Sequence, residues 1–90
     1  MKLAHIFIHG FVQGVGYRQF VKKHATELGL VGWVRNIPDG SVETVVQGPK
    51  EKIQELLTLC KKGPFLSEIE DIIVEYQEKI EDFSSFEIRH

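Results

Sequence analysis

Apolar residues recur along this chain with two different periods, and their order predicts the fold. Spacings of three and four residues predict two amphipathic helices, one from Tyr17 to Leu28 and one from Ile53 to Cys60. Phe86 and Ile88 indicate a short final strand. Alternating or β-branched apolar residues favour four longer strands, over residues 3–9, 30–37, 41–47 and 69–76.

Glycine and proline divide these segments at the expected places. Gly29 stands where a helix usually ends in a left-handed residue, and Gly63-Pro64 closes the second helix. Pro38-Asp39-Gly40 predicts a tight turn, so residues 30–47 form a hairpin. Gly48-Pro49 places a proline at the first position of the second helix.

The resulting order, β-α-β-β-α-β with a short strand appended, predicts an α+β ferredoxin-like sandwich. In this arrangement two helices cover one face of an antiparallel sheet. Right-handed crossovers make the first two strands parallel and place the third strand between them. The carboxyl ends of the first two strands therefore lie at the same edge of the sheet.

Composition narrows the class of protein further. Ninety residues suffice for one domain, which we expect to span residues 1–90. A net charge of −2 and the lack of a basic stripe argue against a nucleic-acid partner. The single cysteine, Cys60, forms no internal disulfide and falls in a helical apolar stripe, so we expect it to be buried. With neither a signal peptide nor a membrane span apparent, we expect a cytoplasmic location. We also expect the chain to be a monomer.

The segment Gly10-Phe11-Val12-Gln13-Gly14-Val15-Gly16-Tyr17-Arg18 joins the first strand to the first helix. Glycines allow a backbone to approach a ligand closely, and the first amides of a helix have no partner inside it. Such a turn favours binding of a small anion, to which the planar guanidinium of Arg18 is able to donate two hydrogen bonds at once. The alternative is a tight connection with a solvated arginine. The segment matches neither a P-loop, which needs Gly-Lys-Ser/Thr, nor G-x-G-x-x-G, because Gln19 replaces the third glycine.

A second group of interest ends the second predicted strand, Gly32-Trp33-Val34-Arg35-Asn36. Asn36 falls at the same sheet edge as the glycine turn, and its amide both donates and accepts hydrogen bonds. It is therefore able to hold a water beside a bound anion, although an asparagine there also often serves only the turn. We expect Trp33 in the core or a groove wall, and Arg35 on the surface. His24 lies beside an apolar helical stripe, which favours a packed histidine over a catalytic one.

Together these two segments closely resemble the two signature segments of the acylphosphatases. The resemblance covers the whole chain, including the Pro38-Asp39-Gly40-Ser41 turn, Gln47-Gly48-Pro49 and Gly63-Pro64. Tyr17 departs from the phenylalanine of many members, and its hydroxyl needs a partner if it is buried. Phe65 stands where a second proline is frequent.

The resemblance implies hydrolysis of the carboxyl-phosphate bond of small acyl phosphates, without metal or cofactor. Arg18 and Asn36 are the implied catalytic residues, and Asn36 orients the attacking water. We expect the substrate phosphate itself to accept the proton, which predicts a rate profile without a histidine inflection. Phe11 and Tyr17 are candidates for the acyl side. The phosphate is expected to be held by Arg18 and by backbone N–H groups from Gln13, Gly14, Val15, Gly16, Tyr17 and Arg18.

Two other classes of function compete with this interpretation. A non-catalytic ferredoxin-like module that senses a small phosphorylated ligand would keep Arg18 and the glycines but would not need Asn36. A sheet that binds RNA would need exposed aromatic residues and basic charge, and the sequence indicates neither.

Overall fold

The computed structural model describes residues 1–90 and contains every element that the sequence predicts. Boundaries differ from the predicted ones by only a few residues. In chain order the elements are β1 (Lys2–Phe11), α1 (Tyr17–Glu27), β2 (Val31–Asn36), β3 (Val42–Gly48), α2 (Lys50–Lys62), β4 (Glu68–Gln77) and β5 (Phe86–Arg89).

The five strands form one sheet in the order β4-β1-β3-β2-β5. β3 lies between β1 and β2 and is antiparallel to both, so β1 and β2 are parallel, as predicted. β5 adds a parallel pair beside β2, which the sequence did not predict, so the sheet is mixed. Because Arg35 faces Arg89 in this pair, residue 90 follows at the same edge as Asn36.

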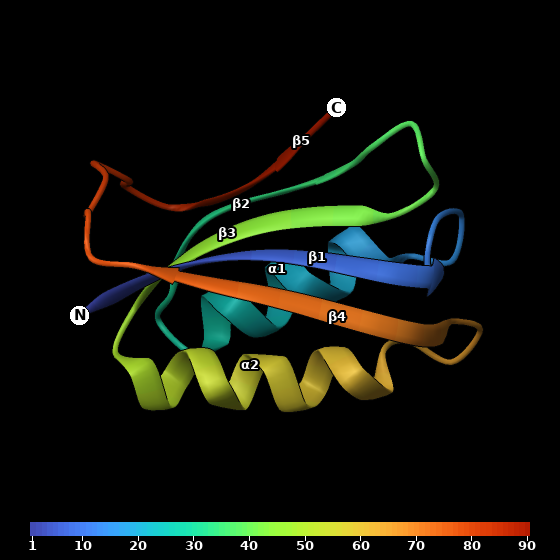
Figure 1. Ribbon diagram of the computed structural model, residues 1–90, viewed down its shortest axis with the longest axis horizontal. Helices are drawn as coiled ribbons and strands as arrows, with labels where there is room; N and C mark the ends of the chain where they lie inside the picture. Colours follow the sequence, from blue (N-terminus) through green and yellow to red (C-terminus); the bar gives the residue numbers. More distant parts are fainter.

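Both helices cover the same face of the sheet (Figure 1). Alternate residues of β1 point toward them, so Ala4, Ile6 and Ile8 are completely buried. They meet one apolar residue per turn from each helix, including Val21 of α1 and Leu56 of α2. This single core packs α1 against β2 and β5, and the N-terminal end of α1 lies near the carboxyl ends of those two strands.

A buried hydrogen bond joins the start of α1 to the end of α2. The Tyr17 hydroxyl donates to the backbone carbonyl of Cys60 at 2.7 Å, which supplies the partner that a buried tyrosine needs. Cys60 is itself fully buried, as predicted. Burial raises the pKa of the Cys60 thiol to about 12, so the thiol stays protonated.

The opposite face of the sheet carries charged and aromatic side chains. The Glu43 carboxylate lies 2.6 Å from His5 Nε2 and accepts a 2.7 Å hydrogen bond from Arg35 Nε. Burial alone would raise the pKa of Glu43, but these two partners hold it below its usual value. Trp33 is not in the core or in a groove wall; it lies on this face, and the guanidinium carbons of Arg35 and Arg89 lie 5.2 and 4.8 Å from the centre of its ring. The prediction failed because an alternating pattern does not say which face is covered.

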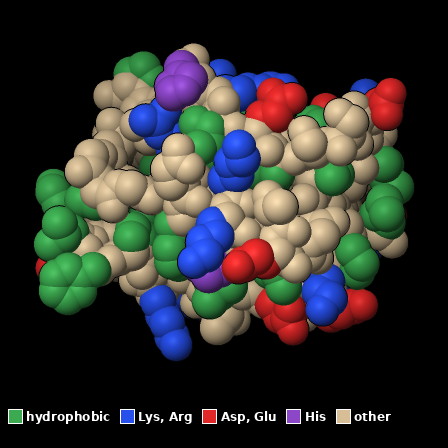
Figure 2. Space-filling view, turned by 180° about the vertical axis from the view of Figure 1, so that it is seen from behind, with side chains coloured by type: hydrophobic (Ala, Val, Ile, Leu, Met, Phe, Trp, Pro, Cys, Tyr) green, Lys and Arg blue, Asp and Glu red, His purple; other side chains and the backbone are tan.

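On the face turned away from the viewer of Figure 1, acidic and basic side chains are interspersed rather than gathered by sign (Figure 2). Neither helix is long and apolar enough to cross a membrane.

Candidate active site

The connection between β1 and α1 has the backbone shape that its glycines allow. Gly14 and Gly16 have φ angles of 77° and 79°, in the left-handed region that side chains disfavour. No atom lies within 4 Å of the position that a Cβ would take at either residue. Glycine is therefore favoured at these two positions because of the left-handed backbone, and not because a side chain would clash with a neighbouring atom.

This conformation leaves a row of backbone donors free. The amides of residues 13–16 donate to no backbone or side-chain acceptor, and the first amide bonded within α1 is that of Phe20, to Gly16. The first turn of α1 contains no acidic residue that would occupy these donors. Free amides at a helix N-terminus carry partial positive charge, so the loop is suited to a small anion.

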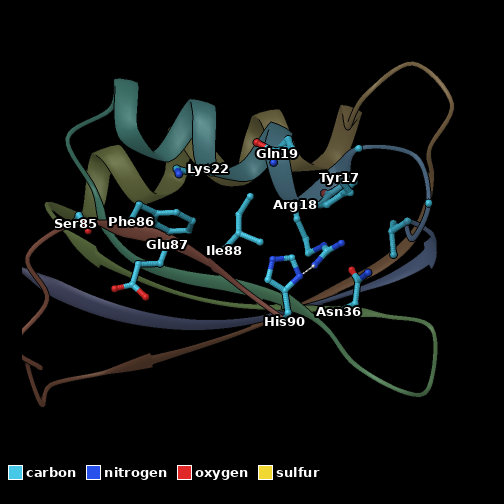
Figure 3. A pocket seen from close by; sticks show the side chains of 13 residues that line it. Tyr17, Arg18, Gln19, Lys22, Asn36, Ser85, Phe86, Glu87, Ile88 and His90 are labelled. Atoms are coloured by element: carbon cyan, nitrogen blue, oxygen red, sulfur yellow. Dashed lines mark hydrogen bonds between the residues drawn. The ribbon is translucent and has the colours of Figure 1, made fainter.

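Arg18 adds the full positive charge. It is the second residue of α1, it makes no ion pair, and it lines a cavity together with Gly14 and Gly16. Its Nη1 lies 3.2 Å from Nδ1 of His90 (Figure 3). Because a guanidinium only donates, the His90 ring accepts at Nδ1 in this contact. The remaining N–H groups of Arg18 are free for a ligand.

Asn36 reaches the same cavity from the end of β2. In the close-up its side chain lies near the Arg18 guanidinium and the glycine loop (Figure 3). Its amide makes no hydrogen bond within the protein, so its donors and its acceptor are free for a water or a ligand.

The cavity has a volume of about 580 Å³ and includes most of the residues predicted from the sequence. It brings together Gly14, Gly16, Tyr17, Arg18 and Asn36. It also includes residues that sequence analysis did not single out, contributed by α1 and by the region of β5: Gln19, Lys22, Ser85, Phe86, Glu87, Ile88 and His90.

Two predicted binding residues, Gln13 and Val15, do not line the cavity. Val15 packs against the hydrophobic core. The Gln13 side chain turns to the β2–β3 hairpin, where its Nε2 donates to the carbonyls of Ile37 and Ser41 at 2.8 and 2.9 Å. Because Ile37 directly follows Asn36, Gln13 ties the glycine loop to the segment that carries Asn36.

His90 is a site residue that sequence reasoning missed. The available signal was weak, since only Phe86 and Ile88 marked β5 and nothing local specified its parallel pairing with β2. His24 lies outside the cavity, packs edge-on against the Phe20 ring and approaches Glu27 at 3.3 Å. Phe11 is 60 % exposed and also lies outside the cavity, so the structure does not support the expectation that it lines the acyl side.

The structure gathers no group of three or more His, Cys, Asp or Glu side chains arranged to hold a metal ion. Beside the glycine loop the cavity thus offers free loop amides, the Arg18 guanidinium, the Asn36 carboxamide and the His90 imidazole, and farther along it is also lined by polar side chains from Gln19, Lys22, Ser85 and Glu87.

Comparisons with known proteins give the same family as the two signature segments. The sequence model of the Acylphosphatase family matches residues 4–88. An acylphosphatase from Caldivirga maquilingensis is 49 % identical over 88 residues, covering 97 % of this chain and 93 % of that protein. One from Moorella thermoacetica is 49 % identical over 75 residues, covering 83 % of this chain and 81 % of that protein. The crystal structure of acylphosphatase from Bacillus subtilis superposes with a TM-score of 0.98 at 37 % identity, covering all of both chains. The chain belongs to the acylphosphatase family.

Proposed function

We propose that this chain hydrolyses the carboxyl-phosphate anhydride bond of small acyl phosphates, giving a carboxylate and inorganic phosphate. Membership of the family and the relatives named acylphosphatase support this activity. The observation that supports the residue assignment is that Arg18, Asn36 and the loop glycines Gly14 and Gly16, whose amides are free, line one cavity. A module that only senses a phosphorylated ligand is not favoured.

In the proposed mechanism the phosphate group binds in the glycine loop. Amides from Gln13 to Arg18 donate to its oxygens, and the Arg18 guanidinium donates two further charge-assisted hydrogen bonds. Hydrogen bonds to charged groups contribute about 1.5–3 kcal/mol each, so Arg18 supplies a large part of the affinity.

Asn36 holds the attacking water on the side of the phosphorus opposite the leaving oxygen. An acyl phosphate already has a good carboxylate leaving group, so positioning and charge stabilisation suffice. The substrate phosphate accepts the proton in this scheme. The imidazole of His90 is the other candidate acceptor, and its contact with Arg18 makes the comparison necessary. A His90→Gln enzyme that retains the wild-type pH profile supports the phosphate, and one that loses an inflection supports the imidazole.

The activity is proposed for one catalytic unit of 90 residues that works as a monomer in the cytoplasm, without a nucleic-acid partner. The single hydrophobic core supports one unit, and the net charge of −2 gives no attraction to nucleic acid.

Release of phosphate from a synthetic aromatic acyl phosphate, with a chelator present, tests the proposal. Turnover that persists with chelator and is lost in Arg18→Gln is the expected result. Arg35→Gln is a matched control, because Arg35 lies on the opposite face of the sheet and does not line the cavity. Turnover that needs added metal, or that survives in Arg18→Gln, would contradict it.

A further inference from the structure

The cavity is much larger than the phosphate group that the glycine loop would hold. Water occupies about 30 Å³ per molecule, and a phosphate group displaces only a few waters. Most of the 580 Å³ therefore remains available beyond the loop. This remaining space follows the seam between α1 and β5, where a second hollow of about 500 Å³ shares Lys22, Ser85 and Phe86 with the first.

The floor of this α1–β5 groove is apolar. Phe86 and Ile88 direct their side chains toward α1, whereas Glu87 points away from the helix, as alternation along a strand requires (Figure 3). A short hydrocarbon segment fits such a floor. The groove begins at the Arg18–His90 contact and runs away from Asn36 toward Ser85 (Figure 3).

Lys22 provides positive charge along the groove, apart from the Arg18 site. It lies four residues after Arg18 on α1, about 6 Å farther along the helix axis, and both side chains line the cavity. Lys22 is exposed and forms no ion pair. Its ammonium group is therefore free to bind an anion a few carbon atoms away from a phosphate at Arg18.

We propose that the α1–β5 groove holds the acyl group and that Lys22 binds a second anionic group, a carboxylate or a phosphonate-type group, at the far end of the acyl chain. The inference rests on the proposed function. In an in-line displacement the acyl oxygen leaves on the side opposite the water. With the water at Asn36, the acyl chain points along the groove toward Lys22. The favoured substrates are then short acyl phosphates that end in a second anion.

Three substrates with chains of similar length test the charge at the far end: butyryl phosphate, succinyl phosphate and 3-phosphonopropionyl phosphate. Wild type is expected to prefer the two with a terminal anion. Lys22→Met should lower kcat/KM for these two about three- to fivefold, through KM, as expected for an exposed charge pair. For butyryl phosphate, which lacks the terminal anion, the same variant should change kcat/KM by less than twofold.

Lys23→Met is the matched control, because Lys23 is the exposed neighbour on α1 and lines neither hollow. Its kcat/KM for each of the three substrates should stay within twofold of the wild-type value. Equal losses on all substrates in Lys22→Met, equal effects of the two lysines, or no wild-type preference for a terminal anion would overturn the groove assignment. A wild type that hydrolyses none of the three would instead contradict the proposed function. A preference restricted to one of the two anionic substrates identifies which terminal group Lys22 binds.

Discussion

The side chain of Gln13 links the two halves of the candidate site, and its removal gives the sharpest structural prediction. Gln13→Met keeps the length of the side chain but loses the donors to Ile37 and Ser41. Each hydrogen bond contributes about 0.5–1.5 kcal/mol, so the free energy of unfolding should fall by about 1–3 kcal/mol. Urea denaturation measures this loss.

The effect of Gln13→Met on turnover follows from the position of the two carbonyls that Gln13 binds. Ile37 adjoins Asn36, so losing the link loosens Asn36 relative to a phosphate held by the loop and Arg18. A misplacement of about 1 Å costs up to about 10²-fold in rate, so we expect kcat to fall at least tenfold. The inhibition constant for inorganic phosphate should change less than about threefold, because Arg18 and the loop amides remain.

Gln54→Met serves as the control, since Gln54 is exposed on α2 and its side chain makes no hydrogen bond. If Gln13→Met loses stability but keeps its kcat, the link is only structural. If phosphate affinity falls as much as kcat, Gln13 instead maintains the shape of the anion loop. Either result would refute the assigned positioning role.

Three further predictions concern the glycine loop, the face of the sheet opposite the helices, and the core. Gly14→Ala should lose about 1–2 kcal/mol in urea denaturation, because a side chain disfavours its left-handed φ, and Gly14→Asn should lose less. Glu43→Gln should lower the free energy of unfolding by about 1–3 kcal/mol at pH 7. Because the pKa of Glu43 is lowered in the folded state, this contribution is complete above the ordinary value of 4.5 and is lost as the pH falls through the folded value. Denaturation of Glu43→Gln and wild type at pH 7 and pH 3 should show the difference narrowing, and a constant difference would contradict it. The Cys60 thiol, with its pKa raised to about 12 by burial, should react with a thiol reagent at pH 8 only after unfolding.

The sequence was informative wherever a function needs a local backbone shape. The glycines and Arg18 lie within a few consecutive residues, and the left-handed φ angles of Gly14 and Gly16 follow from residue type. Because crossover connections are right-handed, β1 and β2 had to be parallel. This was sufficient to predict that the end of β2, and with it Asn36, approaches this loop.

Features that depend on long-range pairing were not predictable in the same way. His90 reaches Arg18 because β5 pairs in parallel with β2, and no turn or periodicity specifies that partner. The side-chain bonds of Gln13 span 24 and 28 residues, so a lone glutamine in a glycine-rich loop gives no sign of them. The position of Trp33 on the outer face likewise depends on which side of the sheet the helices cover.

In the proposed mechanism Arg18 binds the phosphate, whereas Asn36 positions the attacking water. This assignment is tested most directly by Asn36→Ala, assayed for both kcat and the inhibition constant of inorganic phosphate. Removing a positioned polar group of this kind costs about 10²–10³ in rate. We expect a loss of kcat in that range while the inhibition constant stays within about threefold of wild type. Wild-type turnover in Asn36→Ala, or a parallel loss of turnover and phosphate affinity, would contradict the account.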